Sequence, residues 1–364
     1  MRAAATCCGS TNASALDGAR MTATFDVRFH AGRANWPANP FHFQGKGQVV
    51  VEPDFVVVRG STHRSFRFPA RAEHRLRMVD IVNAYSEGED VYFHVLGVRE
   101  NLAVGFSAPD AATAQRLLAL LPARQTEAFA VAHAERNAFH DRIDYWSPST
   151  PVIWTLLALN IGIYFLMWLV RRSLPGGAMG SMLGWGWNSA YDAMLRSAQL
   201  VIWGSNVGDR TLHGEWWRLF TSLFLHGSLL HLAFNMIALW QVGQLVERLF
   251  GSLRFSALYL VAGLCGSIAS VTWNPHVNSV GASGAIFGIV GGLFAFMRRE
   301  NSGIPPTVVN DLRGTLLPFL VFNLAAGFLY PHTDNAAHIG GLIGGWLAGH
   351  LLARSLHVPA ERTT

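Results

Sequence analysis

The sequence has little charge, few cysteines and almost no lysine. Only 14% of its 364 residues are charged and 51% are hydrophobic, whereas an average soluble domain is about a quarter charged. This composition disfavours an ordinary soluble protein. Lys46 is the only lysine, and no segment concentrates the arginines with aromatic residues, which argues against a nucleic-acid partner. Three cysteines are too few for a disulfide framework.

The charges that are present lie mostly in the first part of the chain. Residues 1–150 hold 31 of the 51 charged side chains, and residues 151–353 hold 17. This asymmetry predicts a soluble module followed by a membrane module. We expect an N-terminal extension that is disordered or mis-assigned, a β-rich domain, a linker, a membrane domain and a C-terminal tail, over residues 1–20, 21–122, 123–150, 151–353 and 354–364. A transit peptide is the alternative for the first segment.

The soluble module shows the alternation of apolar and polar residues that is typical of half-buried strands. The runs with this pattern are Thr24–Phe29, Gly47–Val51, Phe55–Arg59, Ser65–Phe68, Asp90–Val95 and Leu102–Phe106. The period becomes helical after Asp110, where Ala112, Leu117 and Leu121 mark an amphipathic helix. The pattern predicts a small, mainly-β barrel or roll with a C-terminal helix. Its histidines are scattered, and no catalytic constellation is visible.

The second module is built from long stretches that carry almost no charge. These stretches are Pro151–Val170, Leu219–Val246, Phe255–Met297 and Gly314–Ala353. About 20 apolar residues suffice to cross a bilayer, and the last two stretches are interrupted by polar residues at 273–276 and 330–335. The sequence therefore predicts an all-α membrane domain with six transmembrane helices. A long loop, Ser173–Glu215, separates the first helix from the second.

The arginines predict how this domain lies in the membrane, because short cytoplasmic segments carry an excess of positive charge. With the N-terminus inside, the cytoplasmic flanks carry Arg136, Arg142, Arg248, Arg254, Arg298, Arg299, Arg313, Arg354 and Arg362. Both termini are then cytoplasmic, and we expect a multi-pass protein of a bacterial inner membrane.

Polar groups within the predicted spans form three clusters, and ionisable residues in such places are functional by default. The clusters are His226, His231 and Asn235; Gly281 to Gly284; and Ala337 with His338. They begin the second, fourth and sixth spans, which all enter from the outer face. All three clusters therefore fall in one layer of the bilayer.

The clusters suggest acyl transfer by a serine that a base activates. Gly284, Gly288 and Gly292 repeat every four residues, as do Gly341 and Gly345. Such small-residue faces let two membrane helices approach closely. Ser283 could then reach the imidazole of His338. One turn apart on a single helix face, His231 and Asn235 could donate hydrogen bonds to an oxyanion, together with the Ser283 N–H.

These residues, in this order and spacing, resemble the motif set of the rhomboid intramembrane serine proteases. The resemblance covers about residues 151–353 and includes Trp217-Arg218, His226, His231, Asn235, the Gly281-Ala282-Ser283-Gly284 run, Ala337-His338, Gly341 and Gly345. It implies a six-helix bundle that cleaves single-span membrane proteins within or next to their transmembrane helices, using no cofactor.

The resemblance also implies individual roles. Ser283 would be the nucleophile and His338 the general base, with His231, Asn235 and the Ser283 N–H in the oxyanion hole, supported by Gly281 and His226. Trp217, Arg218, Gly284, Gly341 and Gly345 would pack the fold. Phe287 stands where some family members have a tyrosine, and its ring can still stack on the His338 imidazole.

Several alternatives stay open at this point. The chain could instead bind and escort transmembrane clients without cleaving them, although Ser283 and His338 are both present. A transporter would require a mid-membrane site and inverted repeats, which are not visible. His226 could organise the outer loop rather than touch a substrate. Asp334 could complete a triad, but capping a helix is the commoner role. A metal at His226 and His231 would lack a third ligand.

Overall fold

We analysed a computed structural model of the chain, which describes residues 22–29, 41–62, 70–97, 102–173, 190–299, 302–329 and 333–353. The expected N-terminal extension and C-terminal tail therefore lie outside the described residues. The chain divides into two compact units, Met1–His133 and Ala134–Thr364. The domain limits expected from the sequence stay predictions.

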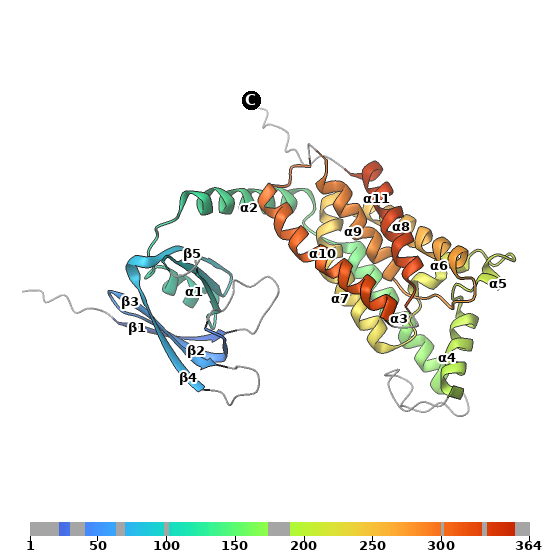
Figure 1. Cartoon of the computed structure of the whole chain (residues 1–364), viewed down its shortest axis with the longest axis horizontal. Helices are drawn as coiled ribbons and strands as arrows, with labels where there is room; N and C mark the ends of the chain where they lie inside the picture. Colours follow the sequence, from blue (N-terminus) through green and yellow to red (C-terminus); the bar gives the residue numbers. More distant parts are fainter. Residues whose placement is uncertain are drawn as a thin grey trace, which may run out of the picture. The chain divides into compact units, whose positions relative to one another are not determined.

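The first unit is β-rich, as the alternation predicted, and contains a seven-stranded antiparallel sheet. Its strands are β1 (Ala23–Phe29), β2 (Phe43–Val51), β3 (Phe55–Thr62), β4 (Ala70–Arg77), β5 (Ile81–Glu87), β6 (Asp90–Val95) and β7 (Leu102–Ser107). The strand order is β4-β3-β2-β1-β7-β6-β5. β1 pairs with β2 along its whole length but with β7 only at Arg28 and Ser107. The sheet curves around the helix α1 (Figure 1).

Aromatic side chains fill the core of this unit. Phe29 packs edge-on against Phe43 and Phe106, with ring centroids 5.2 and 5.9 Å apart. Helix α1 (Ala111–Leu118) closes the core with Ala114 and Leu117. It begins at Asp110, whose carboxylate accepts a hydrogen bond from the Thr113 N–H at 2.7 Å, as a helix N-cap does.

Strands β4 and β5 escaped the sequence analysis for different reasons. The predicted strand at Ser65–Phe68 lies outside the described residues, and β4 follows it as a charged edge strand with mostly exposed residues. Charged residues on an edge strand discourage pairing with other chains and hide the apolar alternation. In β5, the register shifts between Val82 and Tyr85, where Asn83 has a φ of 57°. That irregularity breaks the two-residue period.

A 20-residue helix, α2 (Glu127–Trp146), occupies most of the expected linker. Within it, only Phe139 and Ile143 are buried, so the sequence carries almost no helical pattern of apolar residues. Their side chains join the core of the second unit.

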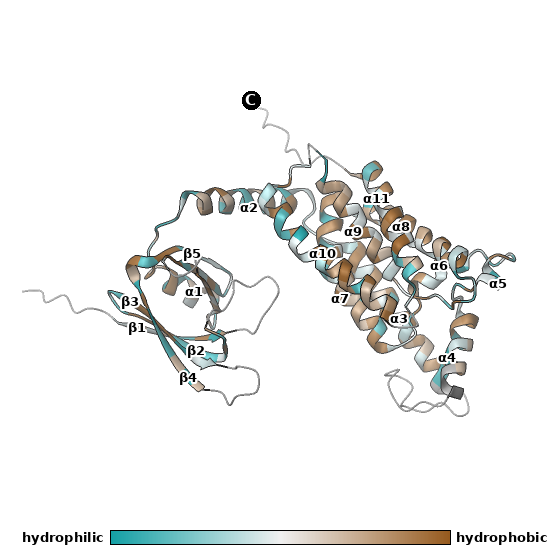
Figure 2. Ribbon diagram, in the orientation of Figure 1, coloured by the Kyte–Doolittle hydropathy of each residue, from teal (hydrophilic) through white to brown (hydrophobic). Residues whose placement is uncertain are grey.

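The second unit is a bundle of helices, and its long helices are mostly apolar (Figure 2). They are α3 (Pro151–Ser173), α4 (Ala190–Trp203), α5 (Gly208–Thr211), α6 (Arg218–Thr221), α7 (Leu229–Phe250), α8 (Ser252–Trp273), α9 (Ser283–Met297), α10 (Pro306–Leu329) and α11 (Asn335–Leu352). Among the described residues, four helices are long and apolar enough to cross a membrane, namely α3, α7, α8 and α10. The helix α9 is apolar but has only 15 residues. Six spans therefore stay a prediction.

The expected long loop between the first two spans is partly helical. Helix α4 and the single turn of α5 lie within Ser173–Glu215. With 14 residues, α4 is shorter than the length that crosses a bilayer, so a search for spans passes over it.

Nearly every residue of α9 is buried, because glycines bring α11 against its backbone. A Cβ added at Gly345 would overlap the carbonyl oxygen of Gly288, and one at Gly341 would overlap that of Gly284. The two helices therefore touch through their main chains, as small-residue faces allow in membrane proteins.

A buried carboxylate fixes the start of α3 against the end of α7. The side chain of Glu247 is fully buried and accepts hydrogen bonds from the backbone N–H groups of Val152 and Ile153, at 3.0 and 2.8 Å. The Ser252 hydroxyl donates a third, at 2.7 Å. An anion at a helix N-terminus satisfies N–H groups that have no partner within the helix. Glu247 therefore sets the position of α3 beside α7.

Candidate active site

The start of α9 is a sharp turn that depends on glycine. Gly281 has a φ of +119°, a conformation that side chains with a Cβ rarely adopt. A Cβ there would also lie 2.8 Å from the Nε2 of His231. The Gly281 N–H donates to the Ser222 carbonyl at 2.9 Å. This turn makes Ser283 the first residue of the helix.

Ser283 and His338 meet across the contact between α9 and α11. The Ser283 Oγ lies 2.9 Å from the Nε2 of His338, and the histidine is only 7% exposed. A neutral imidazole can accept the serine proton through Nε2 when Nδ1 carries the ring proton. The structure thus brings together the two residues that sequence analysis selected as nucleophile and base.

Asp334 caps α11 and does not extend the pair to a triad. Its carboxylate accepts a hydrogen bond from the Ala337 N–H at 3.0 Å. Within the described residues, the Nδ1 of His338 has no hydrogen-bond partner. Of the two interpretations of Asp334 that the sequence allowed, the structure therefore favours the helix cap.

An aromatic ring holds the plane of the His338 imidazole. Phe287 lies one turn after Ser283 on α9, and its ring stacks on His338 with centroids 4.3 Å apart and planes inclined by 2°. Phe287 also contacts Phe319 of α10, with centroids 6.1 Å apart. The stack restricts rotation of the imidazole about its χ2 angle.

The start of α7 brings further polar groups to the turn at Gly281. Ser228 caps this helix, its hydroxyl accepting from the His231 N–H at 3.2 Å. The Nδ2 of Asn235 donates to the His231 carbonyl at 3.1 Å and would lie 3.6 Å from a Cβ at Gly281. His226 is buried, and its ring packs edge-on against His231 with centroids 5.1 Å apart. His231 and Asn235 therefore both border the turn that presents Ser283.

Trp217 and Arg218 lie in the segment that precedes α7. The guanidinium of Arg218 is buried; it donates to Glu215 at 2.6 Å and to the Val201 carbonyl at 2.7 Å. It also lies over the Trp217 ring, 4.7 Å from the centroid. These contacts fasten the segment to the end of α4.

Asn206, which no sequence pattern marked, ties the turn before Ser283 to the region of α5. Its backbone forms an isolated antiparallel bridge with Ser279, with both hydrogen bonds at 3.0 Å. Its buried side chain donates to the Ser267 carbonyl at 2.9 Å and accepts from the Thr211 hydroxyl at 2.9 Å. A single asparagine in a loop has no period or spacing that would mark it in advance.

Comparison with known proteins identifies the helical unit. Residues 213–355 match the model of the Rhomboid domain family. Rhomboid protease AarA of Providencia stuartii is 30% identical over 214 residues, which cover 53% of this chain and 69% of that protein. The chain belongs to the rhomboid family. This membership and the apolar helices make it an integral membrane protein.

Other rhomboid relatives share shorter regions. Rhomboid protease GluP of Bacillus subtilis is 44% identical over 153 residues, or 42% of this chain and 29% of that protein. RHOMBOID-like protein 5 of Arabidopsis thaliana is 42% identical over 141 residues, or 38% of this chain and 45% of that protein. The chain thus spans less than half of the length of these two relatives. The candidate site lies within the matched rhomboid region, and the β-rich unit lies before it.

Proposed function

We propose that this rhomboid protein is a serine endopeptidase that hydrolyses peptide bonds within or next to the transmembrane helices of single-span membrane proteins. The observation that carries the proposal is the 2.9 Å separation of the Ser283 Oγ from the Nε2 of His338. Relatives named rhomboid proteases, such as AarA and GluP, support it. The reaction uses no cofactor.

The proposed chemistry begins with proton transfer from Ser283 to His338. As the Oγ attacks the carbonyl carbon, Nε2 takes its proton and the carbonyl electron pair moves to oxygen. His338 then gives this proton to the leaving amine as the C–N bond breaks, which leaves an acyl ester on Ser283. Water attacks the ester with His338 again as base, and the serine and a carboxylic acid are released.

The negative charge that develops on the carbonyl oxygen needs donors that are already in place. The Ser283 N–H is available for this role at the start of a helix, and His231 and Asn235 border the same turn. The Asn235 amide now donates to its own helix, so it would turn to reach an oxyanion. Losing one such donor typically lowers the rate by about 10²–10³. We assign these three groups to the oxyanion hole, supported by Gly281 and His226.

We further propose that α3, α7, α8, α9, α10 and α11 are six spans of a bacterial inner membrane, with both termini cytoplasmic. The arginine distribution supports this orientation. It places Ser283 and His338 in the outer half of the bilayer, where water needed for hydrolysis can enter. A substrate helix must unwind locally to expose its peptide bond, so small or helix-breaking residues near the cut should favour cleavage.

The test is cleavage of a single-span reporter by the full chain in lipid vesicles. Ser283→Ala and His338→Ala should each lower the rate by at least about 10³. Ser256→Ala and His350→Ala are matched controls, since the described hydrogen bonds of both side chains go to their own helices, and they should cleave at the unchanged rate. A reporter that binds but stays intact with the unchanged protein would favour the escort function instead.

A further inference from the structure

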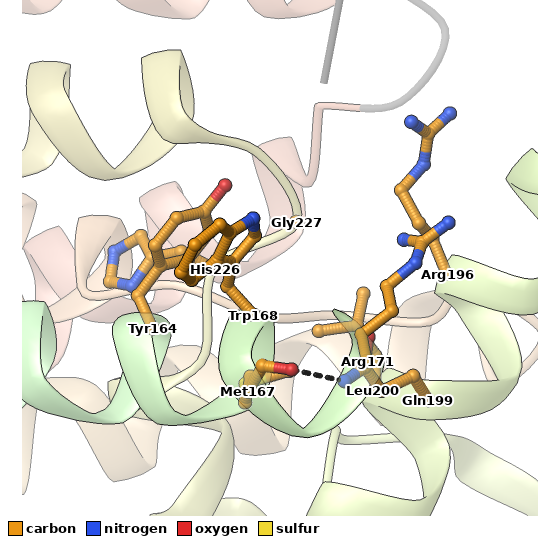
Figure 3. A pocket seen from close by; sticks show the side chains of 9 residues that line it. All are labelled: Tyr164, Met167, Trp168, Arg171, Arg196, Gln199, Leu200, His226 and Gly227. Carbon is orange, nitrogen blue, oxygen red and sulfur yellow. Dashed lines mark hydrogen bonds between the residues drawn. The ribbon is translucent and has the colours of Figure 1, made fainter. Parts of the chain in front are cut away.

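A polar cavity lies beside the candidate active site, between α3, α4 and the segment before α7 (Figure 3). About 360 Å³ of empty space lies along its lining, and this figure includes open solvent. Its polar lining consists of Tyr164, Trp168, Arg171, Arg196, Gln199 and His226. Among the described residues that line it, two are arginines and none is a carboxylate.

Helical spacing directs these side chains to the cavity. On α3, Tyr164, Trp168 and Arg171 follow one another at intervals of four and three residues, which places them on one face. On α4, Arg196 and Gln199 are three residues apart. The Gln199 amide donates to the Met167 carbonyl at 2.7 Å and fixes α4 against α3. The cavity wall is therefore a built contact between two helices.

The two arginines and Tyr164 extend into the same part of the cavity. All three side chains belong to the cavity lining. In Figure 3, this hydroxyl, the Trp168 indole nitrogen and the two guanidinium groups extend toward the same side. Guanidinium groups bind phosphate through paired N–H donors, so this side of the cavity is suited to an anion with several oxygens.

Two of the lining residues have buried nitrogens with unused hydrogen-bonding capacity. Within the described residues, the Nη1 of Arg196 and both ring nitrogens of His226 have no hydrogen-bond partner. His226 is only 2% exposed. Leaving a buried donor unsatisfied is unfavourable, above all for a charged group. An acceptor bound in the cavity would satisfy the Arg196 donor.

The surroundings of the cavity favour a lipid as the source of that acceptor. Arg171 lies in the last turns of α3, a helix long enough to cross the membrane. Phe165, Leu166 and Leu169 of the same helix are exposed and offer an apolar surface for acyl chains. Tyrosine and tryptophan are typical of the depth at which headgroups lie. We propose that the α3–α4 cavity binds the phosphate of an anionic phospholipid.

Native mass spectrometry of the purified full chain tests this proposal without measuring cleavage. The protein is titrated with phosphatidylglycerol and, separately, with phosphatidylcholine of the same acyl chains. Phosphatidylglycerol should bind more tightly. Arg171→Gln and Arg196→Gln should each weaken its binding about fivefold, and the double variant about thirtyfold, because each arginine near a membrane surface contributes one lipid-charge interaction.

Arg210→Gln provides the matched control. Arg210 is an exposed arginine in α5, paired with Glu215 and absent from the cavity lining, so its loss should leave phosphatidylglycerol binding unchanged. Equal affinity for the two lipids, or full binding by the double variant, would overturn the proposal. Displacement of the lipid by millimolar inorganic phosphate would indicate a free-anion site and would also overturn it.

Discussion

The two units of this chain build their cores in opposite ways. The β-rich unit buries large rings, such as Phe29, Phe43 and Phe106, that meet edge to face. The helical unit brings backbone against backbone where Gly345 meets Gly288. In water, the burial of apolar area drives folding. Lipid is itself apolar, so close packing of helices contributes more there.

The two units also differ in whether their charged side chains lie at the surface or are buried. In the β-rich unit, ion pairs such as Arg59 with Glu73 lie at the surface, with both side chains more than 40% exposed. In the helical unit, Glu247 and Arg218 are buried and each makes several hydrogen bonds. A surface pair contributes little stability, whereas a buried charge must be satisfied. Loss of a buried charged residue in the helical unit should therefore cost more stability than loss of a surface ion pair in the β-rich unit.

The largest effect should come from emptying the aromatic core. Phe43→Ala removes a fully buried ring and should lower the free energy of unfolding of the β-rich unit by about 3–5 kcal/mol. The described ring contacts of Phe43 are with Phe29, Phe41 and His74 of its own unit, so labelling of Ser283 by a fluorophosphonate should be unchanged. Urea-dependent proteolysis of the full chain measures the first quantity. Lost labelling would mean that the two units depend on each other.

The glycine contact should tolerate no added methyl group. Gly345→Ala places a Cβ against the Gly288 carbonyl oxygen, and such overpacking costs about 1–3 kcal/mol or more. The matched variant Gly314→Ala adds the same group where nothing lies within 4 Å, and there alanine favours the helix by about 1 kcal/mol. Thermal inactivation in detergent should therefore move in opposite directions. Equal shifts would show that backbone contact does not hold α9 and α11 together.

A smaller effect should follow from removing the ring beside His338. Phe287→Ala loses an aromatic stack worth about 0.5–1.5 kcal/mol beyond its area, so His338 would be less well oriented. The rate of fluorophosphonate labelling should fall up to about tenfold. Phe287→Tyr keeps the stacked ring and should label at nearly the unchanged rate. An unaffected alanine variant would remove Phe287 from its positioning role.

The smallest effect concerns pH and belongs to the β-rich unit. Burial lowers the pKa of His94 below its ordinary value of 6.5, and its Nδ1 lies 3.1 Å from the Asn83 amide nitrogen, which can only donate. Unfolded chains then bind a proton that the folded unit does not. Stability is fully present above pH 6.5 and falls as the pH drops through 6.5 toward the folded pKa.

Urea midpoints of the full chain at pH 7.5 and pH 5.5 test this dependence. The midpoint of the β-rich unit should be lower at pH 5.5. His94→Gln should reduce the difference between the two midpoints, because glutamine does not titrate. If the difference stays the same, another group is responsible, and His74, whose pKa burial also lowers, is the next to replace.

The sequence predicted much of the helical unit because its signals are local. The apolar runs mark α3 and α7, and the glycine repeats indicate the face through which α9 meets α11. The pairing of Ser283 with His338 follows once those two helices are neighbours. Asn206 could not be predicted, because its side chain bonds to the Ser267 carbonyl, 61 residues away in the chain. In the β-rich unit, the irregular backbone at Asn83 hid β5.

Mass spectrometry of the fluorophosphonate-treated chain tests the central proposal most directly. A reactive phosphonate should form one adduct, on the peptide that contains Ser283, and His338→Ala should abolish it while His350→Ala leaves it intact. The proposal would be contradicted by an adduct on another residue, or by His338→Ala protein that reacts at the unchanged rate.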